Sequence, residues 1–321
     1  MNPRPSLASV ARARQRGAAI ITAMLVVTLA AVVVSSLFWR QHVAVRSVEN
    51  RLALAQARWI ERAALDWAKV ILRADARATG TVDHLGEAWA VPVLDTRMDE
   101  TVTAGAKLDE GSSRAALLAG QIYDAQARFN LSALVDGRGA PSAPQVKALR
   151  KLLSLLGKPE SAADPIVARV VQASDTIAPD GKVTPATRPP LTRLADLLDV
   201  PNLDPSVVAV LEAHAIVLPS NTTRINLNTA GPEVLAAAIE GLDVSGARRF
   251  VANRERVPVI DLAMAGTAFG SNVTLDPGLL SVGSSFFLVS GVIRYDRVES
   301  QTETLLQRKN NDVEVIWQLR L

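Results

Sequence analysis

Cysteine is absent from this chain of 321 residues, and histidine and aromatic residues are scarce. Without cysteine the chain can form no disulfide framework, no thiolate metal site and no cysteine nucleophile. The three histidines are His42, His84 and His214, and none stands in a recognisable metal or nucleophile motif. No Walker loop and no GxSxG string occurs. We therefore expect a protein that is not an enzyme and that requires no cofactor.

Acidic residues are absent before Glu49, whereas several arginines crowd the first residues of the chain. The whole chain has 35 basic and 32 acidic residues, a formal net charge of +3. The arginines before residue 17 are Arg4, Arg12, Arg14 and Arg16. Without these four, 31 basic residues face 32 acidic ones, a net charge of −1. The basic excess is therefore mostly a targeting signal rather than a surface for nucleic acid.

A long uncharged run extends from Gly17 to Trp39, over 23 residues. As a helix rising about 1.5 Å per residue, it exceeds the roughly 30 Å hydrocarbon core of a bilayer. The apolar part of a secretory signal is shorter, about 7–15 residues. Four arginines precede the run, whereas Arg40 and Arg46 follow it closely, so the positive-inside bias places the N-terminus in the cytoplasm. We expect residues 18–40 to cross a membrane once, and a plain single-span anchor is the simplest interpretation.

The residues around the start of this run are more specific than a plain anchor. The string Arg14-Gln-Arg-Gly-Ala18 resembles the site that prepilin peptidase cuts in type IV pilin-like proteins. The resemblance implies a leader over 1–17, cleavage between Gly17 and Ala18, and N-methylation of Ala18. Most pilins and pseudopilins carry glutamate at the fifth mature position, where this chain has Thr22. In that family the glutamate pairs with the terminal amine of the subunit above, so its absence fits a subunit at the filament tip.

An apolar stripe continues beyond the membrane and predicts an amphipathic helix over 41–79, with Gly80 as its stop. The stripe consists of Val45, Val48, Leu52, Ala55, Trp59, Ala63, Trp67 and Val70. We expect its C-terminal half to cover the head of the protein. We expect its membrane-side half, from Val45 to Trp59, to pack against helices of other subunits.

The rest of the chain predicts an α+β head with an inserted helical region. Strand-like residues precede residue 135, and two more strands are predicted over Phe286–Tyr295 and 313–321. Between them, residues 136–220 contain many prolines and repeated helix starts, at Ser142, Asp164-Pro165, Thr192 and Asp204-Pro205. Asp or Ser followed by Pro favours a helix start because the side-chain oxygen accepts an orphan N–H and proline lacks one. The predicted divisions are therefore a head over 80–135 and 221–321, and an all-helical insert over 136–220.

A loop within this insert, from Asp175 to Pro190, carries two aspartates, Asp175 and Asp180. Two carboxylates with nearby carbonyls are a possible calcium site. The spacing matches no EF-hand, and an Asp-Gly turn in a solvated loop is the competing interpretation.

The string Ile225-Asn-Leu-Asn-Thr-Ala230, followed by two predicted helices, resembles the helix-hairpin-helix module of competence-type DNA receptors. In that module a Gly-rich hairpin offers backbone N–H groups to phosphates. Here Asp243 stands where a phosphate would approach. The structural interpretation is that Asn226 and Asn228 satisfy turn backbone and that Thr229 or Gly231 caps the following helix.

The combination of these segments is similar to K-type minor pseudopilins of type II secretion systems. The resemblance rests on the leader ending at Gly17, Thr22 in place of glutamate, Ala-Arg-Phe-Asn-Leu-Ser-Ala-Leu at 127–134, the helical insert, Ile-Asn-Leu-Asn-Thr-Ala at 225–230 and the final strands. It implies a long N-terminal pilin-like helix carrying an α+β head. Members of this type can bind calcium in the helical region.

The resemblance also implies a function. It implies a non-catalytic subunit at the tip of the pseudopilus, needed for assembly and for export of folded periplasmic proteins across the outer membrane. The implied partners are the minor pseudopilins I, J and H, the major pseudopilin G and prepilin peptidase, with no nucleic acid. The implied location is the bacterial inner membrane, with the bulk of the chain in the periplasm. The alternative is a membrane-tethered DNA-binding receptor of helix-hairpin-helix type.

Overall fold

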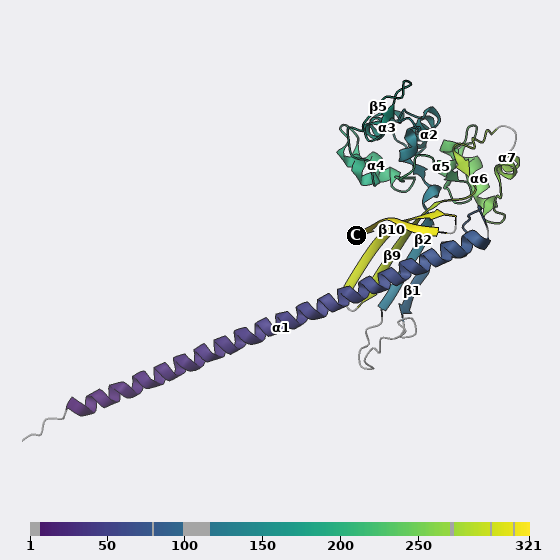
Figure 1. The fold of residues 1–321 in the computed structure, drawn as a ribbon. Helices are drawn as coiled ribbons and strands as arrows, with labels where there is room; N and C mark the ends of the chain where they lie inside the picture. The colour runs from purple at the N-terminus through teal and green to yellow at the C-terminus, as the bar shows by residue number, and fades with distance from the viewer. Residues whose placement is uncertain (1–6, 79, 99–115, 270–272, 296, 311) are drawn as a thin grey trace, which may run out of the picture.

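One long helix, α1 (Leu7–Ala78), carries the head at its C-terminal end (Figure 1). The computed structural model describes residues 7–78, 80–98, 116–269, 273–295, 297–310 and 312–321. The helix ends just before Gly80, whose φ of +72° is a left-handed conformation that glycine adopts without strain. The predicted stop at Gly80 is therefore confirmed.

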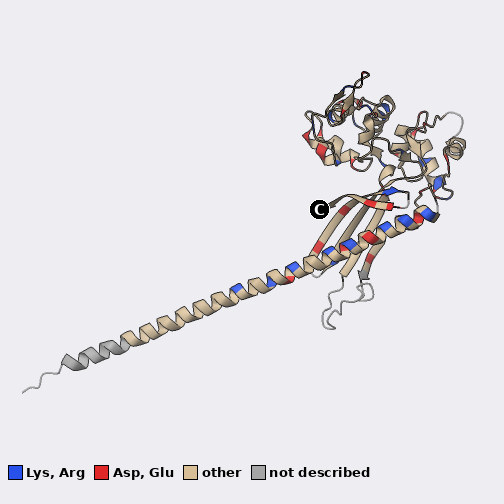
Figure 2. Cartoon of the chain, in the orientation of Figure 1, with Lys and Arg blue, Asp and Glu red and all other residues tan. Residues whose placement is uncertain are grey.

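The first part of α1 has the length and composition of a membrane-spanning helix. Between Ala18 and Ala78 it contains an 18-residue window of mean hydropathy 2.6. Figure 2 shows this part of the helix without charged residues, and charges begin only nearer the head. Its large apolar side chains are exposed in the described structure; Ile21, for example, is 67% exposed.

A five-stranded antiparallel sheet lies against the C-terminal part of α1 (Figure 1). Its strand order is β1 (Val93–Met98), β2 (Ala116–Asp124), β9 (Phe286–Tyr295), β10 (Val298–Lys309) and β11 (Asp312–Arg320). The predicted strand over Phe286–Tyr295 is confirmed. The prediction of only two C-terminal strands is wrong, because β10 lies between them and pairs with both.

Small residues let α1 lie close to this sheet. Ala53, Ala57 and Ala68 are buried on the helix, and β2 places Gly120 opposite Gly291 of β9. A Cβ atom on Gly120 would approach the carbonyl oxygen of Ser290 to 2.9 Å. The helix-to-sheet contact thus depends on side chains that hydropathy patterns weight weakly.

The helices of the head gather beyond one end of the sheet (Figure 1). They are α2 (Ala143–Leu155), α3 (Ala163–Gln172), α4 (Pro205–Leu211), α5 (Pro232–Ala238), α6 (Val244–Arg254) and α7 (Leu262–Phe269), with 3-10 turns η1 (Ala88–Ala90), η2 (Ala125–Ala127), η3 (Leu131–Leu134), η4 (Glu160–Ala162) and η5 (Leu194–Asp199). The helix predicted from Thr192 is only the turn η5, because Asp196 binds back to Thr192 and Arg193 and holds a short capped turn.

Short strand pairs lie among the helices. They are β3 (Phe129–Asn130) with β6 (Ala215–Ile216), β4 (Thr176–Ile177) with β5 (Val183–Thr184), and β7 (Ile225–Asn226) with β8 (Leu280–Ser281). One of them, β4 with β5, lies wholly within residues 136–220. The region 136–220 is therefore mainly, but not wholly, helical. One hydrophobic cluster runs from Phe129 to Leu280 and so crosses residue 220, where the sequence predicts a domain boundary.

Candidate assembly surface and the buried junction behind it

The apolar stripe of α1 is exposed along its whole length. Its side chains include Leu52, Trp59 and Trp67, which are 61%, 68% and 52% exposed. The expectation that the C-terminal half of the stripe covers the head is met only at Trp67, which lines a pocket with residues of β1, β2 and β9, whereas Val70 is 57% exposed. Among the described residues, the large side chains of the stripe from Val45 to Val70 all remain more than half exposed.

A second, smaller apolar face of the same helix makes the contact with the head. It consists of Ala53, Ala57, Ala68 and Leu72, all of which are buried. At about 100° of rotation per residue, this face lies on the opposite side of α1 from Leu52 and Trp59. The helix thus has one side for its own head and another that its own chain leaves uncovered.

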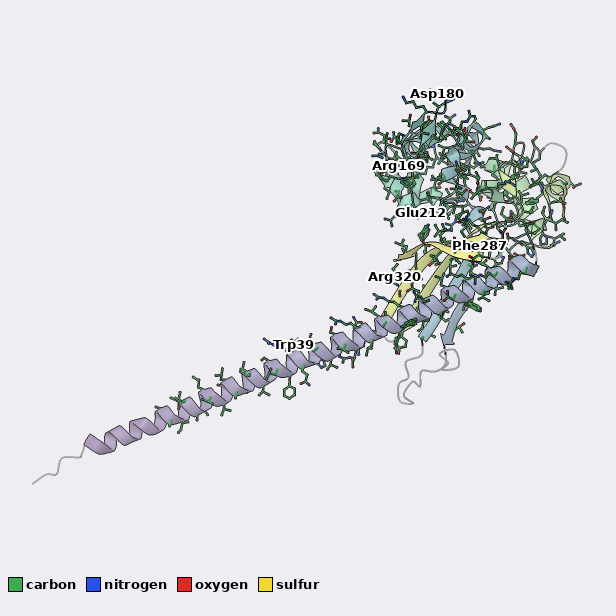
Figure 3. All side chains as sticks on the ribbon, in the orientation of Figure 1. Trp39, Arg169, Asp180, Glu212, Phe287 and Arg320 are labelled. Atoms are coloured by element: carbon green, nitrogen blue, oxygen red, sulfur yellow. The ribbon has the colours of Figure 1, made fainter. Side chains whose placement is uncertain are left out.

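The C-terminal strand fixes the rotation of α1 with polar contacts. Glu61 is 6% exposed and accepts hydrogen bonds from the side chains of Gln318 and Arg320 on β11. Asp312, at the start of the same strand, accepts from Arg73 of α1 at 3.0 Å. These contacts flank an open groove between α1 and β11, and Figure 3 marks Arg320 at its edge.

The residues of the predicted leader junction lie within α1. Gly17 and Ala18 are both helical. The Thr22 hydroxyl donates to the carbonyl oxygens of Ala18 and Ala19, at 3.1 and 3.0 Å. Thr22 therefore satisfies its only polar group inside its own helix, which a glutamate carboxylate in a bilayer could not do.

Behind α1, a buried carboxylate joins the sheet to the helical region. Asp124, the last residue of β2, accepts hydrogen bonds at Oδ2 from Asn226, Thr229 and Ser284, at 2.9, 2.6 and 2.6 Å. Its Oδ1 accepts from the backbone N–H of Gln126 at 2.7 Å. Burial raises the pKa of the Asp124 carboxyl, and the hydrogen bonds from Ser284 and Thr229 act in the opposite direction.

The Asn-Leu-Asn-Thr string is the other half of this junction. Asn226 Oδ1 accepts from the N–H of Asn228, so Asn226 does satisfy turn backbone as predicted. Asn228 pairs with both backbone groups of Val259. Of the two predicted caps, Gly231 is the N-cap of α5, whereas Thr229 does not cap the helix and donates to Asp124 instead.

The hairpin before α6 presents a carboxylate where a DNA phosphate would approach. Asp243 caps α6 and accepts from the N–H of Gly246 at 2.6 Å. Of the arginines on that helix, Arg254 is buried and donates to the carbonyl of Leu227. Arg248 lies 3.6 Å from Glu233. These contacts hold the hairpin and the arginines within the folded head, which weighs against the phosphate-binding interpretation.

The two aspartates predicted as calcium ligands serve as turn acceptors. Asp175 accepts from the N–H of Ala186 at 2.9 Å, and Asp180 accepts from that of Lys182 at 3.0 Å. Neither belongs to a group of three potential metal ligands in the described part of the chain. Figure 3 places Asp180 at the outer end of the helical region, far from α1. Calcium binding by these residues stays a prediction.

A cluster that the sequence did not suggest lies where α1 enters the head. Asp75, Asp83 and Glu87 are all buried, and Arg308 of β10 donates to Asp75 at 3.0 Å and to Asp83. Burial, together with Glu87 and Asp83, raises the pKa of Asp75 to about 6, against the opposing effect of Arg308. The spacing of three acids around Gly80 was a visible signal, but Arg308 lies 233 residues from Asp75 in sequence.

Comparison with known proteins gives this arrangement a family. Two family models, both described as type II secretion system protein K, match residues 127–220 and 225–277. Type II secretion system protein K of Pseudomonas aeruginosa is 31% identical over 95% of this chain and 92% of its own length. This chain belongs to the type II secretion system protein K family.

Further relatives agree with that assignment. Protein K of Pectobacterium carotovorum is 25% identical over 95% of this chain and 96% of its own length. A chain in the crystal structure of the GspK-GspI-GspJ complex from enterotoxigenic Escherichia coli has the same fold, with a TM-score of 0.62 and 19% identity over 85% of this chain and 99% of that one. The expected fold, a long N-terminal helix with an α+β head, is thus confirmed, and the protein K family accounts for it.

Replacing Asp124 by asparagine tests the buried junction. An amide nitrogen at Oδ2 would face the amide of Asn226, whose orientation the Asn228 N–H fixes; at Oδ1 it would face the N–H of Gln126. Either orientation sets the new amide N–H against one obligatory donor, so Asp124→Asn should lower the free energy of unfolding by about 2–4 kcal/mol. The measurement is urea unfolding of the full chain in detergent micelles, followed by tryptophan fluorescence.

Asp136→Asn is the matched control. Asp136 is exposed, and its Oδ1 alone accepts both local hydrogen bonds, so an asparagine retains them. The cost there should stay under about 1 kcal/mol. An equal loss of unfolding free energy in the two variants would show that the buried Asp124 contributes no more to stability than an exposed aspartate.

Proposed function

We propose that this chain is a minor pseudopilin that sits at the tip of the type II secretion pseudopilus and supports export of folded periplasmic proteins. The observation that carries the proposal is the exposed apolar stripe of α1, on the side of the helix opposite the head. It is a non-catalytic role: the chain supplies a surface, and other components supply energy.

The proposed partners are the minor pseudopilins I and J. A neighbour of the same fold comes from a complex named for GspK, GspI and GspJ, which supports this choice. The stripe matches the requirement of a helix-to-helix contact, with anchors at three- and four-residue spacing. Minor pseudopilin H and the major pseudopilin G would lie further down the filament.

Two features support the tip position. Thr22 satisfies its own hydroxyl and so needs no subunit above it. The helical region from α2 to α7 extends beyond the end of the sheet, where it would be too bulky to stack between successive subunits of a filament (Figure 1). In this proposal the membrane part of α1 lies in the bacterial inner membrane, with the N-terminus in the cytoplasm and the head in the periplasm.

A negative charge introduced on the stripe should weaken assembly without destabilising the fold. In Leu52→Glu and Trp59→Glu, a carboxylate replaces an apolar side chain that is more than half exposed, so the head should keep its stability. Association loses the burial of a large side chain, about 1.5–3 kcal/mol each, plus the cost of a buried charge. We expect at least about a tenfold loss of co-purified I and J pseudopilins and a matching loss of secretion.

Ser47→Glu adds the same charge on an exposed part of α1 outside the stripe and should leave both readouts unchanged. If the stripe variants co-purified with I and J and supported secretion as well as the parent chain, α1 would not be the assembly surface. Loss of binding together with loss of head stability would point to misfolding, which the thermal unfolding of each variant reports.

Mass spectrometry of the mature chain tests the pilin-like processing. With prepilin peptidase present, the N-terminal peptide should begin at Ala18 and carry one methyl group. Gly17→Val should leave the precursor uncut, because the peptidase must accommodate this residue next to the scissile bond, while Gly80→Ala should be processed normally. A mature terminus other than methylated Ala18 would contradict the pseudopilin proposal.

A further inference from the structure

Three buried carboxylates converge at the point where α1 meets the sheet. Asp75 lies in the last turn of α1, Asp83 follows the Gly80 turn, and Glu87 precedes η1. One oxygen from each lies within 4.8 Å of the others. Three segments of chain therefore deliver oxygen ligands to one small volume.

One carboxylate oxygen of Glu87 is buried without a hydrogen bond among the described residues. Glu87 Oε2 accepts from the N–H of His84 at 3.0 Å and from the Trp89 indole at 2.6 Å. Glu87 Oε1 is fully enclosed, and among the described residues it has no hydrogen-bond partner. His84 Nε2 lies 3.7 Å from it, beyond hydrogen-bond distance. A buried carboxylate oxygen left in this state costs free energy, so it points to a missing ligand.

The charged groups of the cluster leave two negative charges unbalanced. Arg308 supplies one positive charge against three carboxylates, and it donates to Asp75, Asp83 and the carbonyl of Ser284. With three ionised carboxylates, the formal charge of this group with Arg308 is −2, which one divalent cation neutralises.

Arg308 does not block such a cation. It uses one oxygen each of Asp75 and Asp83. The other oxygen of Asp83 accepts from the N–H of Ser284 at 2.7 Å. A carboxylate offers about four lone-pair sites, so it can accept such donors and still coordinate a metal ion. All available protein ligands are oxygen atoms, which suits calcium, magnesium or manganese rather than softer metals.

We propose that Asp75, Asp83 and Glu87 bind a hard divalent cation of the calcium class. The ion would hold the end of α1, the turn after it and the start of η1 against Arg308 of β10. This site is separate from the predicted loop at Asp175 and Asp180, which Figure 3 places at the opposite end of the head. It is independent of the proposed role in secretion.

Terbium luminescence provides a local probe, because Tb³⁺ replaces Ca²⁺ and is excited by a nearby indole. Trp89 touches Glu87, so Tb³⁺ added to the full chain in detergent micelles should emit on excitation of tryptophan, and excess Ca²⁺ should quench it. Trp89→Phe should remove most of this emission. The Tm of the parent chain should rise by at least about 3 °C in 1 mM CaCl₂ relative to EDTA.

Glu87→Gln separates binding from folding. Without metal it removes one of three repelling carboxylates, so its Tm in EDTA should equal or exceed that of the parent chain. Its apparent affinity for Tb³⁺ should fall at least about tenfold, and Ca²⁺ should no longer raise its Tm. Asp75→Asn should behave in the same way.

The double variant Asp175→Asn, Asp180→Asn is the control and should keep both the emission and the Tm rise. The proposal is overturned if the Tm of the parent chain does not respond to CaCl₂, or if the emission survives Glu87→Gln. It is equally overturned if the control variant alone loses the emission, because the cation would then lie in the distant loop.

Discussion

The burial of the Asp124 carboxylate is the constraint on which the head depends. A carboxylate taken out of water costs several kcal/mol unless its lone pairs are filled, and here donors from three separate stretches of chain fill them. The end of β2, the Asn226–Thr229 string and Ser284, two residues before β9, therefore meet at one buried site. Their meeting joins the helical region to the sheet, and the sheet in turn supports α1.

Because the described part of the head contacts one side of α1, the other side of the helix is exposed. The head needs only the small residues Ala53, Ala57 and Ala68, which let helix and sheet approach closely. The large side chains of the stripe, including Trp59 and Trp67, contribute little to the isolated chain and are exposed to solvent or lipid. Large exposed apolar faces on a folded chain mark interaction surfaces. A subunit of a helical assembly has reason to fold in this way.

Sequence patterns predicted the features that depend on local chemistry: the long helix, its end near Gly80, helix α2, helix α4 with its Asp204 cap, and strand β9. The side chain of Ser142 makes no capping hydrogen bond to α2. They failed where tertiary contacts decide. The sequence of strand β10 is rich in polar residues, so no strand is predicted there, although Thr302 and Thr304 are buried in the folded sheet. Periodicity detects large apolar residues and gives alanine little weight. The sequence therefore places the C-terminal half of the stripe, rather than the alanine face, against the head. Thr229 looked like a cap because its true partner, Asp124, lies 105 residues earlier.

Native-state hydrogen exchange tests the central role of the Asp124 junction most directly. The amides that bind within and around it are those of Gln126, Asn228, Ser284 and Ser285. If the junction unites the head, these amides should open with the same free energy as β9, α2 and α5, equal to that of global unfolding. If α2 and α5 exchanged through a lower-energy opening that left β2 and β9 protected, the helical region would fold independently and the account would be contradicted.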